Sequence, residues 1–313
     1  MSNSARPLWI LGGFLGTGKT TLLNHLLEEF APEPVGVLVN DFGTVGVDVH
    51  RISTDREGPL VELNGGQIFC SCISGSFVDS LLELSAAPVS GILVEASGMA
   101  KPRALAPIIE EARKRSEDRF YYAGMVSVID APRFEKMRAA VNAVEEQVVY
   151  ADLVIINKCD GLEEERVATV ARAVRYLNPS CRILRTTFGR VRREELPESP
   201  VAPLERRGPG GEEYRGWEDK KPVAVTWNPP EKLSRQELEE AVREKATTAL
   251  RIKGYLESEE GPVYISAVGE SVEIEAVSAI PGAPGLTEFY PSNGAEVRVQ
   301  TDSLDLRAES CEP

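Results

Sequence analysis

The sequence predicts an α/β protein in two parts: a mostly parallel sheet with helices, followed by a smaller α+β domain. Short apolar runs alternate with longer amphipathic runs through the first 190 residues, which is typical of parallel strands buried on both faces. A glycine-rich loop follows the first apolar run. Residues 191–222 then break the rhythm with prolines and glycines set among charges, which predicts a linker.

The elements follow from these runs in order. In the first part, residues 1–190, we expect strands at 8–12, 35–40, 91–95, 121–129, 153–157 and 182–186, and helices at 19–30, 75–86, 103–116, 132–149 and 163–177. In the second part, residues 223–313, we expect strands at 223–227, 263–268, 272–277 and 296–300, and a helix from Ser234 to about Ala249. Glu237 stands three residues after Ser234, so the two predict a capping box.

The glycine-rich loop has the spacing of a phosphate-binding loop, Gly13-x4-Gly18-Lys19-Thr20. Glycines at 13, 16 and 18 let backbone N–H groups approach phosphate oxygens, and the start of the next helix presents further unpaired donors. Lys19 would reach the β- and γ-phosphates, and the Thr20 hydroxyl would hold Mg²⁺. The alternative is a glycine-rich turn between a strand and a helix that binds no ligand.

A second motif, Asn157-Lys158-Cys159-Asp160, follows the apolar run 151–156 and indicates which nucleotide is bound. The Asp160 carboxylate can accept hydrogen bonds from the ring N–H and the exocyclic amino group of guanine, while the Lys158 stem lies along the purine face. Adenine would leave that carboxylate unpaired, and sites of this kind reject the wrong ligand strongly. Alone, the motif could be an ordinary polar loop; together with the first loop it favours GTP over ATP.

Two acids follow other apolar runs. Glu95 stands where an acidic residue usually holds Mg²⁺ through a water, and Gly98 where a backbone N–H meets the γ-phosphate. Asp41 follows the run 35–39, in a loop suited to be a first switch. We therefore take Lys19, Asp41 and Glu95 as the candidate catalytic residues. Both acids could instead be solvated groups at strand ends.

Two cysteines at i and i+2, Cys70 and Cys72, cannot easily bridge to each other, because a disulfide needs particular Cα and Cβ separations. They can direct two thiolates to one soft metal ion if the backbone bends. Zinc takes four ligands, or three and a water, so this pair alone is an incomplete site. Small, partly buried free cysteines are the alternative. The position between the two switches favours metal binding.

The succession GGFLGTGKTT, VNDFGTVGVD, ELNGG…CSC, VEASGMAKP, VSVIDAPRF and ADLVIINKCD resembles the CobW-like metallochaperone GTPases, relatives of the nickel-insertion GTPases of hydrogenase and urease maturation. The resemblance covers residues 7–190 and continues weakly beyond them. It implies a P-loop GTPase that binds zinc, cobalt or a similar ion and delivers it to a client metalloprotein or its apo form.

The resemblance also implies roles for particular residues. GTP phosphates and Mg²⁺ would be bound by the loop residues Gly13, Gly16, Thr17, Gly18, Lys19, Thr20 and Thr21. Guanine would be bound by Asn157, Lys158 and Asp160, and the transition metal by Cys70 and Cys72. The chain departs from the family pattern twice, with Ile73 where a third cysteine is usual and Asp41 where a glutamate commonly stands. Because Asp41 still offers a carboxylate oxygen, a Cys70–Cys72–Asp41 set is left open as the candidate metal site.

Composition limits the partners. The net charge is −14 over 313 residues, which argues against nucleic acid and anionic membranes and leaves room for a basic patch on a client. No apolar run reaches the length of a membrane span, and the N-terminus lacks the apolar core of a signal peptide. Five cysteines without framework spacing suit a reducing cytoplasm. A homodimer is left open.

Three classes of function remain. The first is a GTP-hydrolysing metallochaperone. The second is a GTPase switch or maturation factor for a metalloenzyme, without a high-affinity metal site of its own. The third is a metal reservoir, which the nucleotide motifs disfavour because storage needs no guanine recognition.

Overall fold

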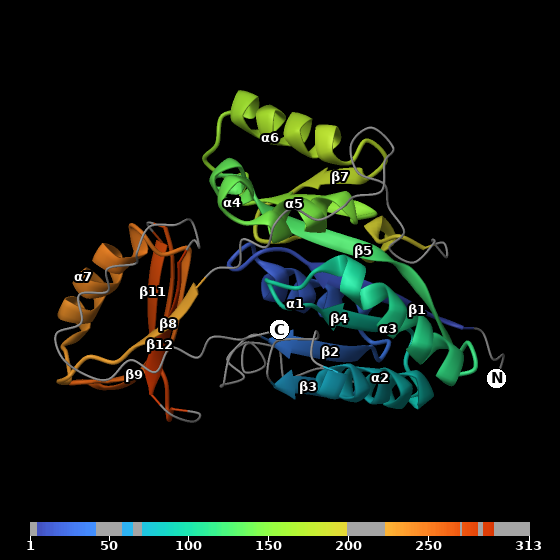
Figure 1. Ribbon diagram of the computed structural model, residues 1–313, viewed down its shortest axis with the longest axis horizontal. Coiled ribbons are helices and arrows are strands. Elements are labelled where there is room, and N and C mark those ends of the chain that lie inside the picture. Colours follow the sequence, from blue (N-terminus) through green and yellow to red (C-terminus); the bar gives the residue numbers. More distant parts are fainter. Residues whose placement is uncertain are drawn as a thin grey trace.

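The computed structural model describes residues 5–41, 58–64, 71–198, 223–269, 271–280 and 284–290 (Figure 1). For residues 40–41, 62–64, 71–74 and 223–224 it describes the backbone alone. An α/β domain with a parallel sheet is followed by a smaller domain of antiparallel strands and one helix. The predicted fold class is confirmed.

The strands of the N-terminal domain form one parallel sheet in the order β3-β2-β4-β1-β5-β6-β7. They are β1 (Arg6–Gly12), β2 (Gly36–Asp41), β3 (Leu60–Asn64), β4 (Ile92–Glu95), β5 (Phe120–Asp130), β6 (Leu153–Asn157) and β7 (Arg182–Arg185). Because β1 pairs with β4 on one side and β5 on the other, the loop after β1 lies near the middle of the sheet's carboxyl edge, where ligands bind in open α/β sheets.

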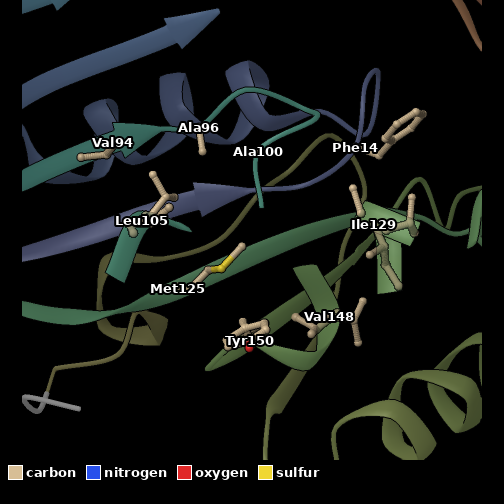
Figure 2. Close-up of a cluster of buried hydrophobic side chains, with 14 of the residues drawn as sticks. Phe14, Val94, Ala96, Ala100, Leu105, Met125, Ile129, Val148 and Tyr150 are labelled. Atoms are coloured by element: carbon tan, nitrogen blue, oxygen red, sulfur yellow. The ribbon is translucent and has the colours of Figure 1, made fainter. Parts of the chain in front are cut away.

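Helices cover both faces of this sheet. They are α1 (Lys19–Phe30), α2 (Ser71–Ala86), α3 (Pro102–Arg115), α4 (Phe134–Ala140), α5 (Asn142–Val149) and α6 (Glu164–Leu177). Successive residues of β1 point to opposite faces: Leu8 and Ile10 join a large cluster with α2 to α6, whereas Trp9 and Leu11 join a cluster with α1. Figure 2 shows part of the larger cluster, with Phe14 and Ile129 close to the start of the loop after β1.

Residues 191–198, the first part of the expected linker, pack onto the N-terminal domain. Val191 and Leu196 are buried in the cluster on the α1 side, on either side of a 3₁₀ turn at Arg193–Glu195. The Trp9 indole Nε1 donates a hydrogen bond to the Pro197 carbonyl at 2.7 Å. We therefore propose that the linker begins after residue 198.

The C-terminal domain is a five-stranded antiparallel sheet in the order β11-β10-β9-β12-β8. Its elements are β8 (Val223–Trp227), α7 (Arg235–Ala246), β9 (Arg251–Ser258), β10 (Gly261–Val268), β11 (Ser271–Ala276) and β12 (Gly285–Tyr290). Leu238, Val242 and Ala246 of α7 pack on one face of the sheet. The expected capping box of Ser234 and Glu237 is present at the start of α7.

Several element predictions were wrong. Strands β3, β9 and β12 were not expected, and the expected helix to Ala249 ends at Ala246. The expected helix 132–149 is two helices, because Val141 between them has an extended backbone (φ −140°, ψ 113°). Helix α2 begins at Ser71 rather than at residue 75, which places Cys72 in its first turn. The expected strand 296–300 lies outside the described residues.

None of the helices in the described ranges has the length and apolar composition that a membrane span requires.

Candidate nucleotide-binding site

A cavity of about 700 Å³ opens at the carboxyl edge of the parallel sheet, a volume within the usual range for ligand pockets. It is lined by most of the residues that the nucleotide motifs single out: Gly16, Gly18, Lys19, Thr20, Thr21, Glu95, Gly98, Asn157, Lys158 and Asp160. Gly13 and Thr17 belong to the same loop but do not line the cavity. The parallel topology thus brings to one place two motifs whose bonded residues are 140 and 142 positions apart in the chain.

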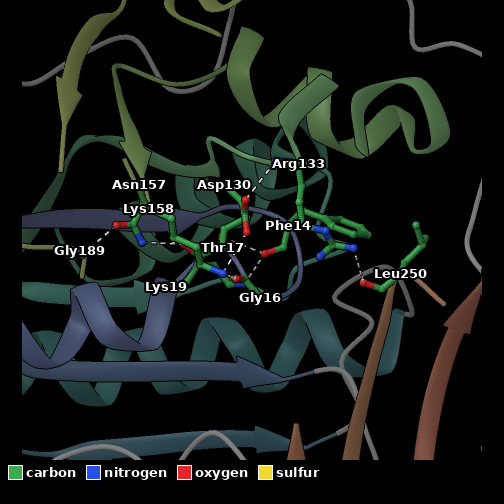
Figure 3. Close-up of polar contacts among 10 residues, drawn as sticks. All are labelled: Phe14, Gly16, Thr17, Lys19, Asp130, Arg133, Asn157, Lys158, Gly189 and Leu250. Carbon is green, nitrogen blue, oxygen red and sulfur yellow. Dashed lines mark hydrogen bonds and ion pairs between the residues drawn. The ribbon is translucent and has the colours of Figure 1, made fainter. Parts of the chain in front are cut away.

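The loop after β1 is bonded to itself around the Phe14 carbonyl. That oxygen accepts hydrogen bonds from the Thr17 hydroxyl at 2.9 Å and from the Lys19 Nζ at 3.2 Å (Figure 3). Gly18 caps α1 with a left-handed backbone (φ 102°), and a Cβ there would lie 2.5 Å from the Asn157 side-chain nitrogen. Only glycine fits this position, because both its backbone angle and its space exclude a side chain.

Thr20 and Glu95 contact each other in the lining of the cavity. The Thr20 hydroxyl donates to the Glu95 Oε1 at 2.9 Å, and Glu95 is only 3% exposed at the end of β4. A hydroxyl and a carboxylate from neighbouring elements are the oxygen ligands that Mg²⁺ accepts in nucleotide sites. These two side chains therefore fit the ion that the sequence predicts there.

Asn157, at the end of β6, joins three segments. Its Nδ2 donates to the Thr17 carbonyl at 2.9 Å, and its Oδ1 accepts from the Gly189 backbone N–H at 3.0 Å (Figure 3). The side chain is 2% exposed. Sequence analysis expected Asn157 to bind guanine, whereas both of these bonds hold the phosphate loop and the segment after β7 in place.

Lys158 is also bonded within the protein. Its Nζ donates to the Gly16 carbonyl at 2.8 Å and pairs with the Asp130 carboxylate at 2.9 Å (Figure 3). Its backbone is left-handed (φ 59°), a conformation that is uncommon for residues other than glycine. Such residues cluster at functional sites. Asp160, two residues on, lines the cavity and is exposed.

Among the N-terminal residues at this site that sequence analysis did not identify are Asp130 and Phe188. Asp130 is buried at the end of β5 and pairs with Lys158. The sequence signal for Asp130 is the same as for Glu95: an acidic residue at the end of an apolar run. Phe188 lines the cavity after β7, with a left-handed backbone (φ 55°) and 66% exposure. Its signal was an aromatic side chain in a glycine-containing loop at the sheet's carboxyl edge.

The C-terminal domain forms one wall of the cavity, with Arg251, Ser266, Val268, Ser271 and Glu273. No motif predicted this. Apolar packing fixes the contact, since Leu250 and Phe289 are buried in the large cluster of the N-terminal domain. Arg133 adds a hydrogen bond from its Nη2 to the Leu250 carbonyl at 3.1 Å (Figure 3).

The predicted transition-metal ligands fall at the limits of the described residues. Asp41 is the last residue of β2 and Cys72 lies in the first turn of α2, both described by backbone alone, and Cys70 lies outside the described ranges. Among side chains that are described, no three His, Cys, Asp or Glu residues gather into a metal site. Burial raises the pKa of the Cys159 and Cys181 thiols, which disfavours the reactive thiolate form.

Comparison with known proteins matches both domains. The family model described as CobW/HypB/UreG, nucleotide-binding domain, matches residues 7–185, and that described as Cobalamin synthesis protein cobW C-terminal domain matches residues 223–289. The zinc-regulated GTPase metalloprotein activator 1 of Dictyostelium discoideum is 26% identical over 246 residues, 67% of this chain and 51% of that protein. The zinc chaperone YjiA of Escherichia coli is 34% identical over 181 residues, 53% of this chain and 55% of that protein.

Among solved structures, a zinc-bound triple mutant of the YjiA GTPase is similar over 92% of this chain and 95% of its own, with 19% identity and a TM-score of 0.48. The matched regions span about half the length of the two sequence relatives.

Proposed function

Because the chain belongs to the CobW/HypB/UreG family of nucleotide-binding proteins, we propose that it binds GTP and hydrolyses it to GDP and phosphate. The observation that carries the proposal is the convergence of two independent motifs in one cavity. The phosphate loop at Gly13–Thr20 and the Asn157–Asp160 motif are far apart in the chain, yet the Asn157 amide bonds directly to the Thr17 carbonyl. A phosphate-binding loop and a guanine-reading motif that line one cavity suit the two ends of one nucleotide.

At the phosphate end, we propose that backbone N–H groups of the loop and the Nζ of Lys19 bind the β- and γ-phosphates. Lys19 would exchange its bond to the Phe14 carbonyl for phosphate oxygens. Thr20 and Glu95 would hold Mg²⁺, which neutralises charge on those phosphates when bound. Asp41 at the end of β2 is the candidate for orienting the attacking water. Without a partner, turnover should be slow, on the order of 10⁻⁴ to 10⁻² s⁻¹.

At the base end, we propose that Asp160 accepts hydrogen bonds from guanine while the Lys158 stem supports the purine face. The bonds of Lys158 to Gly16 and Asp130 support this, because they hold that stem beside the phosphate loop. Phe188, exposed at the cavity, offers an aromatic face for the base. Asn157 then acts mainly by fixing the loop that the nucleotide occupies.

Competition between nucleotides tests the guanine assignment. Asp160→Asn should lower affinity for GTP and raise affinity for XTP, because the xanthine carbonyl replaces the guanine amino group and needs a donor opposite it. Asp79→Asn, a change of the same kind at an exposed position on α2, should leave both affinities unchanged. Equal affinities of the unchanged chain for ATP and GTP would refute the assignment.

We further propose that the output of the GTPase is delivery of a transition metal, zinc or cobalt, to a client metalloprotein. The names of the relatives, a zinc chaperone and a zinc-regulated activator, support zinc first. Cys70, Cys72 and Asp41 are the proposed ligands of this cargo. A cytoplasmic location and a homodimer remain predictions from the sequence.

Equilibrium dialysis with Zn²⁺ and Co²⁺, with GDP or a GTP analogue present, tests metal delivery. Because linkage is reciprocal, GTP and metal must change each other's affinity by the same factor, and we expect at least about fivefold. Cys70→Ala and Cys72→Ala should each remove metal binding and leave GTP affinity in metal-free buffer intact. Normal GTP binding without metal binding by the unchanged chain would favour the alternative, a maturation factor or switch with no metal site of its own.

A further inference from the structure

The C-terminal domain contacts the phosphate loop directly. A Cβ built on Gly16 would lie 2.7 Å from the Val268 Cγ2 and 3.4 Å from the Arg251 Nη1. Val268 ends β10 and Arg251 begins β9, the neighbouring strand. The middle of the phosphate loop is therefore covered by one apolar side chain and one guanidinium from another domain.

One nitrogen of the Arg251 guanidinium is unsatisfied among the described residues. Its Nε is buried and has no hydrogen-bond partner among the described residues. Buried polar groups nearly always have partners, so an orphaned one at a cavity needs an explanation. Arg251 also lines the nucleotide cavity, so an anion bound there would supply an acceptor once the side chain turned to present its guanidinium.

Positive charge gathers around this point. Burial lowers the pKa of Arg133; the nearby Asp130 carboxylate opposes this effect, and the Arg251 guanidinium adds to it. Asp130 also forms an ion pair with Lys158. In the wall formed by the C-terminal domain, Glu273 is the acidic residue. Figure 3 shows Lys158 between Asp130 and Gly16 of the loop, with the Arg133 guanidinium turned toward Leu250. A polyanion bound in the loop would offset this charge.

We infer that Arg251 contacts the polyphosphate of the bound nucleotide, so that the C-terminal domain completes the nucleotide site. The inference rests on the proposed GTP binding. Arginine suits the task because its planar fork binds phosphate through two parallel hydrogen bonds and keeps its charge. Nucleotide binding and docking of the C-terminal domain are then coupled, because each places Arg251 and the polyphosphate in contact and so favours the other.

Affinities of the full chain for a non-hydrolysable GTP analogue test the contact. Arg251→Gln should weaken binding at least tenfold, and Arg251→Lys should weaken it less because the charge remains. The loss for GDP should be smaller, because GDP carries less charge. Arg243→Gln is the matched control: it removes an exposed arginine of the same domain, on α7, and should change affinity less than twofold.

Two further readouts separate the possible failures. Binding of the GTP analogue by the unchanged chain tests the proposed GTP function. If the unchanged chain binds the analogue and Arg251→Gln binds it with an affinity within twofold of that, only the inference about Arg251 is overturned. Hydrogen exchange on the unchanged chain needs no variant to fold. The GTP analogue should slow exchange at the start of β9, and unaltered exchange there despite saturating nucleotide would also overturn it.

Discussion

Removal of the Asn157 side chain should destabilise the N-terminal domain before any nucleotide is added. Asn157→Ala deletes two hydrogen bonds, to the Thr17 carbonyl and from the Gly189 N–H, at a position that is 2% exposed. Each buried partner left unpaired costs roughly 1–3 kcal/mol, so we expect a loss of about 2–6 kcal/mol in the free energy of unfolding. For a domain of this size that loss lowers the melting temperature by about 4–24 °C.

Calorimetry in nucleotide-free buffer measures this loss, with the domain's transition identified as the one that a GTP analogue shifts. Asn157→Asp keeps the acceptor for Gly189 but sets a carboxylate against the Thr17 carbonyl, so it should be at least as destabilising. The exposed Asn228 is the control, and Asn228→Ala should change stability by less than about 0.5 kcal/mol. An Asn157→Ala domain that melts normally and only binds GTP less tightly would refute the clamp and restore Asn157 as a base-reading residue.

Three further predictions address catalysis, base binding and pH. Lys19→Ala should reduce phosphate release by at least about 100-fold, because it removes the cation proposed for the β- and γ-phosphates; normal turnover would contradict the mechanism. Phe188→Ala should weaken guanine nucleotide binding about tenfold through lost stacking, measured by calorimetric titration, with little change in stability because Phe188 is exposed. Two hydrogen bonds from Arg113, the nearer at 2.8 Å, lower the pKa of Glu110 from 4.5 to about 2. The pair's stabilisation is therefore present above pH 4.5 and lost as the pH falls toward 2. Glu110→Gln should cost about 0.5–1 kcal/mol in urea unfolding at pH 7, because the pair is partly exposed; an equal cost at pH 2 would argue against the ion pair.

The strands of the parallel sheet were predictable where both faces are buried. Strand β6 (Leu153–Asn157) begins with four apolar residues, which suit a strand that packs under helices on either side, and its predicted bounds are confirmed. Strand β3 is at the sheet edge and begins with Leu60, which is 37% exposed, so no such run marks it. The break at Val141 has neither glycine nor proline. Strand β9 contains Lys253 and Gly254, and its pairing with β12 depends on residues far along the chain.

The two nucleotide motifs were predictable because each is local: its residues stand side by side in the sequence and bond to the same loop. Asp130 and Phe188 are identified by what they meet in space. Asp130 is recognised as part of the site by its ion pair with Lys158, which comes almost thirty residues later in the chain. The wall containing Arg251 depends on how Leu250 and Phe289 pack on the other domain, and no pattern within either domain encodes that docking.

The long-range bonds of Asn157 also bear on how the protein is made. The phosphate loop leaves the ribosome near the start of synthesis, yet its fixed shape depends on Asn157, which is 140 residues later than Thr17, and on the Gly189 amide beyond it. At 5–20 residues per second, about 10–30 s separate the loop from its last support. During the first part of that interval the apolar strand β1 also has no β5 beside it. The nascent chain thus carries an exposed central strand until β5 has been translated, and a phosphate loop without its last support until Gly189 has been translated.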